Sequence, residues 1–319
     1  MNSFGRNFRV SIFGESHGKV VGVTLDGVRA GVALCEDDFV GDMERRKAGA
    51  LGTTTRIEDD RVEILSGVYN GHTTGAPLTL VIKNREARPS DYSELRLHPR
   101  PSHADFVAHK KFLGYNDPRG GGHFSGRVTA ALTAAGVVAK KMLGDSVSIT
   151  SQIVKCGDIE AAIKSGDSVG GVVECRAQGV GIGVGEPFFD SVESVLSHLL
   201  FSIPAVRGVE FGAGFSAAEM LGSQHNDPIV SADGKTSTNN AGGVVGGLTN
   251  GEEVVVRVAI KPTPSIACEQ STFRFEDDSF SSGELSSLTI EGRHDSCIAL
   301  RAGVVVEAAV AIGLIILKV

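Results

Sequence analysis

The sequence has no tryptophan, few aromatic residues and little proline. Of its 319 residues, 6% are aromatic and 10 are proline. So little proline argues against a collagen-like chain or a proline-rich low-complexity segment. A repeat of fixed period, the signature of a solenoid, is also missing, and no linker-like stretch divides the chain. We therefore expect one domain over residues 1–319, built from mixed layers of sheet and helix.

Cysteine is scarce as well, and no C-x-x-C pair occurs. The five cysteines lie far apart in the sequence: Cys35, Cys156, Cys175, Cys268 and Cys297. This spacing argues against a zinc ribbon, a thioredoxin-type pair and a disulfide framework, and it indicates a reducing compartment. The N-terminal residues lack the apolar core of a signal peptide. The apolar C-terminal stretch contains Glu307 and is too short to span a bilayer. We expect a cytoplasmic protein with no membrane partner.

Positive charge is in deficit. The chain has 31 Lys and Arg residues against 38 Asp and Glu residues, which gives a formal net charge of −7. Nucleic-acid binding generally needs a basic face, so this balance argues against a nucleic-acid partner. Nine histidines are present, but no H-E-x-x-H or H-x₃-H pair occurs. The sequence therefore gives no support to a metal site.

Glycine is the residue in excess. It contributes 41 residues, about 13% of the chain, where about 7% is usual. The excess is concentrated in four segments: 14–18 (GESHG), 119–127 (RGGGHFSGR), 179–185 (GVGIGVG) and 239–251 (NNAGGVVGGLTNG). Such density indicates tight turns or backbone that must approach something closely, so we look for a site there. For 179–185 we find no chemical role and expect a structural loop.

Hydrophobic patterning predicts eight strands and six helices. The strands are rich in Val, Ile and Thr, and we place them at 8–13, 20–28, 61–68, 78–83, 147–154, 171–176, 209–212 and 253–261. The helices show apolar periodicity, and we place them at 36–47, 103–113, 128–143, 158–165, 192–201 and 298–317. The 128–143 helix is apolar nearly all round, which predicts burial between layers.

One glycine segment matches a catalytic motif in the wrong context. Residues 14–18 fit the G-x-S-x-G of serine hydrolases, with Ser16 as the nucleophile. That motif needs a helix after the serine, but the residues after Gly18 are β-type. A G-K-T at 234–236 lacks the earlier glycine of a P-loop, and no glycine segment fits a dinucleotide-binding turn. A serine hydrolase is the first alternative function.

Cations and histidines lie between and beside the glycine segments. The cations are Arg45, Arg46, Lys47, Arg96, Arg100, Lys110, Lys111, Arg119 and Arg127. In an acidic protein such clusters predict pockets for small, multiply charged anions, because the guanidinium fork binds carboxylate and phosphate. His17 and His103 adjoin these turns, which favours acid–base chemistry. Residues 261–266 (KPTPSI) can hold a phosphate or form an ordinary proline turn, and Asp295 can be a functional acid or a helix cap.

Ten segments, in order along the chain, resemble the chorismate synthase family. They are 13–18, 42–49 (DMERRKAG), 64–84, 100–105 (RPSHAD), 119–127, 202–215, 222–227 (GSQHND), 239–251, 261–266 and 292–302. The resemblance implies an α+β fold, a β-α-β sandwich with helices packed between antiparallel sheets, assembled as a homotetramer. It also implies conversion of 5-enolpyruvylshikimate 3-phosphate to chorismate, the last common step towards the aromatic amino acids. That reaction is an anti-1,4-elimination of phosphate that needs reduced FMN (FMNH2).

The same resemblance implies roles for individual residues. His103 would protonate the departing phosphate, His17 would protonate or stabilise the reduced flavin, and Asp295 would relay the proton taken from the substrate. The residues implied to hold the substrate anions are Ser16, Arg46, Arg100, Arg127 and Arg301. The implied flavin contacts are Arg46, His123, Phe124, Ser125, Pro204, Ala205, Asn240, Gly246, Lys261, Thr263, Pro264, Ser265 and Arg293.

The sequence departs from the common family pattern in one glycine segment. Where relatives commonly carry RGGGRSSARET, His123, Phe124, Gly126 and Val128 replace Arg, Ser, Ala and Glu. One cation and one acid are lost together, and we expect more apolar flavin contacts. No nucleotide-reductase fingerprint is visible, so we expect an external flavin-reducing system, with NADPH as the reductant associated with the family. A non-catalytic flavoprotein that binds phosphate is the second alternative function.

Overall fold

Two antiparallel sheets form the outer layers of the fold. The computed structural model describes residues 1–54, 58–85, 94–290, 292 and 294–318. The first sheet orders its strands as β1 (Ser3–Phe4), β2 (Arg9–Gly14), β3 (Val20–Asp26), β7 (Leu78–Lys83) and β4 (Val62–Ser66). The second orders them as β10 (Val206–Phe211), β13 (Val254–Ile260), β9 (Gly171–Gln178) and β8 (Ser148–Cys156). Neighbouring strands in both sheets run antiparallel.

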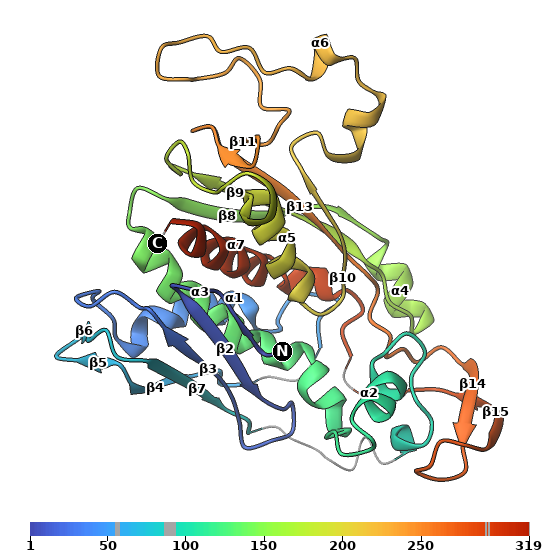
Figure 1. Cartoon of the computed structure of the whole chain (residues 1–319). Coiled ribbons are helices and arrows are strands. Elements are labelled where there is room, and N and C mark those ends of the chain that lie inside the picture. The colour runs from blue at the N-terminus through green and yellow to red at the C-terminus, as the bar shows by residue number, and fades with distance from the viewer. Residues whose placement is uncertain (55–57, 86–93, 291, 293, 319) are drawn as a thin grey trace.

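Helices fill the space between the two sheets (Figure 1). Helix α3 (Thr129–Leu143) packs on β2, β3 and β7, and α7 (Gly303–Lys318) packs on β8 and β9. The two helices also contact each other, and α5 (Val192–Ser202) packs on α7 and β10. A Cβ on Gly136 of α3 would lie only 2.3 Å from the Cβ of Ala308, so glycine permits this close helix crossing. The predicted β-α-β sandwich is confirmed.

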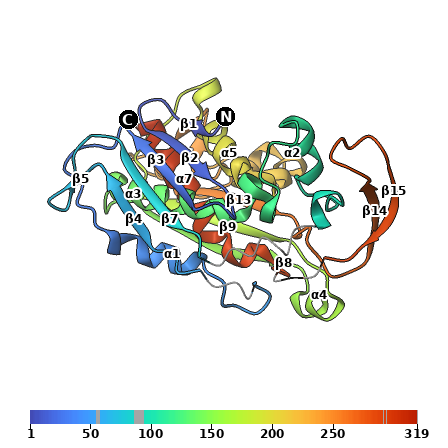
Figure 2. The ribbon, with the colours of Figure 1, turned by 90° about the horizontal axis from the view of Figure 1, so that it is seen from below.

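The two central helices are apolar on nearly every side because both of their faces are covered. Most side chains of α3 are buried, as its sequence predicts, and so are those of α7 from Val304 to Ile315. Figure 2 views the five-stranded sheet from outside, with α7 behind it. Despite this apolar character, none of the helices within the described residues is long and apolar enough to cross a membrane.

Smaller elements extend from the sandwich at two ends (Figure 1). Near one end lie α2 (Asp105–Lys111), η4 (Arg119–Phe124), α4 (Ile159–Ser165) and a hairpin of β14 (Gln270–Phe275) and β15 (Gly283–Leu288), whereas α1 (Val40–Arg46) packs on α3 and α7. At the top of Figure 1 lie α6 (Gly222–His225) and the short pair β11 (Val244–Val245) and β12 (Leu248–Thr249). A further short pair, β5 (Val68–Tyr69) and β6 (His72–Thr73), extends the first sheet region. The hairpin and the short pairs were not predicted.

The eight predicted strands are present with boundaries shifted by a few residues, and four of the six predicted helices are too. The helices predicted at 36–47 and 298–317 are each divided into a 3₁₀ segment, η1 (Glu36–Phe39) or η8 (Ile298–Arg301), and the α-helix that follows it. The largest shift among strands is in β10, which begins at Val206 rather than 209 and contains a register irregularity after Val206. The helix expected at 103–113 begins at Asp105, because His103 and the residues before it form turns.

The glycine segment 179–185 is a structural loop, as expected. Thr249 is buried, and its hydroxyl donates a hydrogen bond to the carbonyl of Gly181. That hydroxyl also accepts one from the amide of Val184. A Cβ on Gly179 would lie 1.8 Å from the carbonyl oxygen of Ser146. The loop is thus shaped by packing against β12 and its neighbours.

Candidate active site

Two histidines lie on either side of consecutive glycines. Gly120 and Gly121, in η4, have φ values of +58° and +81°, a region that favours glycine. A Cβ on Gly120 would lie 2.4 Å from ring atoms of His17, and a Cβ on Gly121 would lie 3.0 Å from Cε1 of His103. The glycine run therefore lets the backbone pass between the two predicted acid–base residues.

The Ser16–His17 turn joins two antiparallel strands. It connects β2 to β3, and the amide of Ser16 donates a 3.0 Å hydrogen bond to the carbonyl of Gly122. Both side chains are buried. Since a strand, not a helix, follows the serine, the turn is not a nucleophile elbow. The geometry argues against the serine-hydrolase alternative.

His103 is oriented by a carboxylate and an arginine. Its Nδ1 lies 2.6 Å from Oδ1 of Asp105, and Asp105 also accepts hydrogen bonds from Nε and Nη2 of Arg100, both at 2.8 Å. Burial would raise the pKa of Asp105, but the hydrogen bonds from Arg100 and His103 outweigh it and hold that pKa far below its usual value. With Nδ1–H directed at an ionised carboxylate, the ring is fixed and Nε2 is left for proton exchange.

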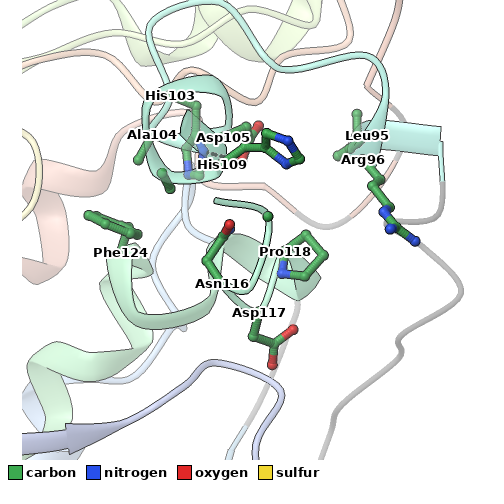
Figure 3. Close-up of a pocket in the computed structure, with 13 residues that line it drawn as sticks. Leu95, Arg96, His103, Ala104, Asp105, His109, Asn116, Asp117, Pro118 and Phe124 are labelled. Carbon is green, nitrogen blue, oxygen red and sulfur yellow. Dashed lines mark hydrogen bonds and ion pairs between the residues drawn. The ribbon is translucent and has the colours of Figure 1, made fainter. Parts of the chain in front are cut away.

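His103 opens onto a cavity of about 270 Å³ (Figure 3). The lining also includes Asp105, Gly121 and Phe124, together with Leu95, Arg96, Ala104, Ala108, His109, Gly114, Asn116, Asp117 and Pro118. Figure 3 shows Phe124 and Asn116 across the cavity from His103 and Asp105. The Phe124 ring is partly exposed and lies 6.2 Å from that of Phe112, which gives one wall the apolar character expected from the departure at this position.

A buried carboxylate joins two of the predicted substrate arginines. Asp60 accepts hydrogen bonds from Nη2 of Arg46 and Nη1 of Arg127, and all three side chains are almost completely buried. Burial would raise the pKa of Asp60, but the two guanidinium groups lower it further than burial raises it. The sequence analysis missed Asp60, because nothing in its local pattern marks it as a partner for arginines that are 14 and 67 residues away.

Arg301 and Asp295 form a second pair beside this cluster. Nη2 of Arg301 lies 3.1 Å from Oδ2 of Asp295, and Oδ1 of Asp295 accepts a 3.0 Å hydrogen bond from the amide of Thr54. Asp295 is therefore an ion-pair partner and not the helix cap that the sequence also allowed. Burial lowers the pKa of Arg46, and the nearby charge of Arg301 lowers it further.

Two guanidinium nitrogens of this cluster are left over. Among the described residues, no hydrogen-bond partner is present for Nε of Arg46 or Nε of Arg301, although both atoms are buried. Buried donors are normally satisfied, so these two atoms are candidates to donate to an anionic ligand.

Asn84 connects the histidine turn to the arginine cluster. Its Nδ2 donates to the carbonyls of Glu15 and Gly18 at 3.0 and 2.9 Å, and its Oδ1 accepts from Nε of Arg127 at 2.9 Å. One side chain therefore fixes both ends of the Ser16–His17 turn relative to Arg127, a predicted substrate arginine. Asn84 lies within a segment of the family resemblance, but its role could not be deduced from the sequence because it bridges three separate parts of the chain.

The 261–265 segment lies against the His103 turn. Nζ of Lys261 donates to the carbonyl and the hydroxyl of Ser102 at 2.6 and 2.9 Å, and Nη1 of Arg100 donates to Oγ of Ser265 at 3.0 Å. The amide of Lys261 donates to the carbonyl of Ala205, which places Pro204 and Ala205 here too. Burial lowers the pKa of Lys261, and the nearby charge of Arg207 adds to this effect.

This segment also fits a phosphate-bearing cofactor. Within the described part of the chain, the buried Oγ1 of Thr263 has no hydrogen-bond partner, and the Lys261 ammonium lies close by in sequence. A cation and two hydroxyl groups within five residues, at Lys261, Thr263 and Ser265, are donors of the kind that bind a phosphate.

Some predicted flavin contacts lie elsewhere in the chain. Asn240 and Gly246 belong to the region of α6 and β11, at the opposite end of Figure 1 from α2. Nδ1 of His123 lies 2.7 Å from the carbonyl of Gly14, so this side chain ties the glycine loop to β2. Ser125 accepts a hydrogen bond from the amide of Arg127, and Arg293 lies outside the described residues. Val128, the other departure, is buried in the core.

Comparisons with known proteins identify the family of the chain. The chorismate synthase family model matches residues 8–162 and 156–318. A chorismate synthase of Chitinophaga pinensis is 56% identical over 321 residues, which cover 98% of this chain and 95% of the relative. One from Dehalococcoides mccartyi is 44% identical over 345 residues, with 96% and 93% covered.

A solved structure supports the same assignment. A crystal structure of a chorismate synthase aligns with a TM-score of 0.74 at 27% identity, covering 98% of this chain and 92% of the other. The resemblance of the ten sequence segments is thereby confirmed. The chain belongs to the chorismate synthase family, whose members are carbon–oxygen lyases.

Proposed function

We propose that this chain eliminates phosphate from 5-enolpyruvylshikimate 3-phosphate to give chorismate, by an anti-1,4-elimination that requires reduced FMN. The observation that carries the proposal is the pair of histidines on either side of Gly120 and Gly121, together with Arg46 and Arg301, whose buried Nε atoms have no partner among the described residues. Acid–base groups beside cations suit a reaction in which a phosphate must leave and a proton must be taken up.

The arginine cluster would bind the three anionic groups of the substrate. Arg46, Arg127 and Arg301 supply three buried or half-buried cations. Asp60 and Asp295 pair with them, and the nearby charge of Glu58 raises the pKa of Arg46 and of Arg127, against the lowering by burial. Two of these guanidinium groups still have an Nε to donate. Substrate carboxylates and phosphate would complete these hydrogen bonds, and the gain is large because the surroundings exclude water.

Lys261, Thr263 and Ser265 would hold the FMN phosphate, with Phe124 as an apolar contact for the ring. When bound, reduced FMN would supply electron density to the substrate carbon that loses phosphate. The described contacts leave the Thr263 hydroxyl available for this purpose.

The contacts of the two histidines support different roles for them. The His17 turn is tied through Asn84 to Arg127, on the side of the substrate arginines. His103 is tied through Asp105 and Arg100 to Ser265, on the side proposed for the flavin. We therefore propose that His17 donates the proton to the departing phosphate and that His103 holds a proton on the flavin side. This exchanges the two roles that the family resemblance implied.

Asp295 would receive or pass on the proton that is removed from the substrate. Its carboxylate is buried and is held by Arg301 and the Thr54 amide, so its orientation is fixed before substrate binds. These two contacts fix the positions of the carboxylate oxygens, so a proton passed through Asp295 would follow a defined path.

The test of the reaction is an anaerobic assay with chemically reduced FMN and 5-enolpyruvylshikimate 3-phosphate. We expect chorismate absorbance to appear together with free phosphate. Folded protein that binds FMN but releases no phosphate would support the non-catalytic flavoprotein instead. Labelling of Ser16 by a fluorophosphonate, without any need for flavin, would favour the hydrolase.

The exchange of histidine roles has its own test. In single-turnover experiments, His17→Ala should slow phosphate release by about 10²-fold or more while leaving the spectrum of bound reduced FMN unchanged. His103→Ala should lower turnover much more than FMN affinity, and it should alter the spectrum or the apparent pKa of the bound reduced flavin. A flavin change in the His17 variant alone would restore the roles implied by the resemblance.

We also propose a cytoplasmic homotetramer that receives its reduced flavin from an external system. The assembly is supported by several large apolar side chains that are exposed on the single chain, including Phe188, Phe189 and Phe215.

A further inference from the structure

Two cysteines that are 141 residues apart in the sequence meet next to the proposed active site. The Sγ atoms of Cys156 and Cys297 are 3.3 Å apart, and both residues are free thiols. Cys156 is exposed at the end of β8, whereas Cys297 is fully buried directly before η8 (Ile298–Arg301). The pair therefore has one thiol that solvent reaches and one partner behind it.

The backbone around the pair holds the two sulfur atoms together. Cys156 lies opposite Gly171 of β9, and a Cβ on Gly171 would lie 2.8 Å from the Cβ of Ala299. Glycine at 171 thus allows the 297–301 segment to pack closely on the end of the second sheet. The amide of Cys297 donates a 3.0 Å hydrogen bond to the carbonyl of Gly52, which fixes the segment from the other side.

We propose that Cys156 and Cys297 form a reversible disulfide when the protein meets a low-molecular-weight disulfide such as oxidised glutathione, and that this bond lowers turnover. In the first step the Cys156 thiolate attacks the oxidant, which releases one thiol and leaves a mixed disulfide on Cys156. In the second step the Cys297 thiolate attacks Sγ of Cys156 and expels the second thiol. Two protein thiols are oxidised, and one small disulfide is reduced to two thiols.

The two thiols differ in reactivity, as these two reaction steps require. Burial, together with the neighbouring Cys156 thiol, raises the pKa of Cys297 to about 11. Cys297 is therefore a poor first nucleophile, and exposed Cys156 reacts first. The closing step should accelerate as the pH rises from neutrality, because the thiolate fraction of Cys297 increases.

The effect on turnover follows from the position of Cys297 between two site residues. This part of the inference rests on the proposed function. A disulfide needs an S–S distance of ~2.05 Å, so the sulfur atoms must approach by roughly 1.2 Å from their 3.3 Å separation. Asp295 and Arg301 lie two residues before and four residues after Cys297 and make hydrogen bonds of 3.0–3.1 Å. A displacement of about 1 Å can cost about 10²-fold in rate, so we expect kcat/KM to fall at least about tenfold.

The chemical test incubates reduced full-length protein with oxidised glutathione and analyses it by intact mass and peptide mapping. Wild type should lose two hydrogen atoms in mass and yield a linked peptide pair containing residues 156 and 297. Cys156→Ser should yield no such pair. Cys35→Ser, which removes a different exposed thiol, should still form it. Glutathione retained on Cys156, or two thiols that remain alkylatable in the wild type, would overturn the proposal.

The functional test compares the same samples with photochemically reduced FMN, so that no chemical reductant attacks the disulfide. We expect oxidised wild type to lose activity, dithiothreitol to restore it, and oxidised Cys156→Ser to stay fully active. The proposed effect on turnover would be contradicted if the disulfide formed without loss of activity. It would also be contradicted if oxidised Cys156→Ser lost as much activity as oxidised wild type. An inactive reduced wild type would contradict the proposed function. The mass analysis would still show whether the disulfide forms.

Discussion

Gly120 and Gly121 show how two residues without side chains shape the site. Each has a left-handed backbone conformation, and each leaves space that a histidine ring fills. The glycine excess in the composition thus has a definite use here, whereas the glycines of 179–185 only shape a loop against Thr249. Both segments look alike in sequence, and only the neighbouring side chains distinguish them.

At this scale we predict that Gly120→Ala nearly abolishes activity. The new Cβ would lie 2.4 Å from the His17 ring, and alanine at φ +58° is strained by about 1–2 kcal/mol. We expect kcat/KM to fall by about 10²-fold, with a lower melting temperature. Gly181→Ala is the matched control, because nothing lies within 4 Å of a Cβ there. Wild-type kinetics for Gly120→Ala would contradict the close packing of His17 on the loop.

Helix α1 connects the site to the core through adjacent arginines. Arg46 points to Asp60 in the site, while Arg45 binds Glu307 of α7 with Nη1–Oε2 and Nη2–Oε1 distances of 2.8 and 2.5 Å. Glu307 is buried and also accepts from Nζ of Lys140 on α3 and from the hydroxyl of Ser151 on β8. One carboxylate in the middle of an apolar helix thereby joins α1, α3, α7 and β8.

We predict that Glu307→Gln lowers the free energy of unfolding by about 2 kcal/mol near neutral pH, because hydrogen bonds to charged partners are lost. Burial would raise the pKa of Glu307, but Arg45 and Lys140 hold it below its ordinary value of 4.5. A carboxyl whose pKa is lowered on folding stabilises the protein above its unfolded pKa and loses that effect as the pH falls through the folded value.

The difference between variant and wild type should therefore shrink below about pH 4.5. Urea unfolding at neutral and acidic pH measures it. Arg6→Ala, which removes an exposed ion pair with Asp190, is the control and should change stability by less than about 1 kcal/mol. A Glu307→Gln difference that does not vary with pH would contradict an ionised Glu307.

The elements of the sandwich were predictable from the sequence, but several contacts of the site were not. Runs of Val and Ile identified strands such as β13, and the Ala-rich pattern identified α3, because burial itself produces these patterns. The β14–β15 hairpin was missed because its strands are polar and largely exposed. Asp60, Asn84 and the Cys156–Cys297 pair were missed because their partners are distant in the chain, and spacing carries no information about such contacts.

The surface of the single chain predicts assembly. Phe188 and Phe189 are 85% and 92% exposed, which is unusual for large aromatic side chains on a monomer. We expect the Phe188→Ser, Phe189→Ser double variant to weaken the proposed tetramer by more than about tenfold in dissociation constant, since each buried Phe contributes about 1.5–3 kcal/mol. Light scattering across a dilution series measures this. Leu285→Ser, at another exposed apolar side chain, is the control and should leave assembly unchanged. If the double variant still formed an intact tetramer, the interface would lie elsewhere on the surface.

Asp60 gives the arginine cluster a resident anion. Before any substrate arrives, its carboxylate already neutralises part of the charge of Arg46 and Arg127. Under the proposed function, substrate anions would bind the Nε donors of Arg46 and Arg301 that lack a partner among the described residues, while Asp60 keeps its pairs with the Nη atoms. The substrate would therefore meet partly neutralised guanidinium groups and not bare cations. The same carboxylate would thus limit how tightly the released phosphate is retained, and so would favour repeated turnover.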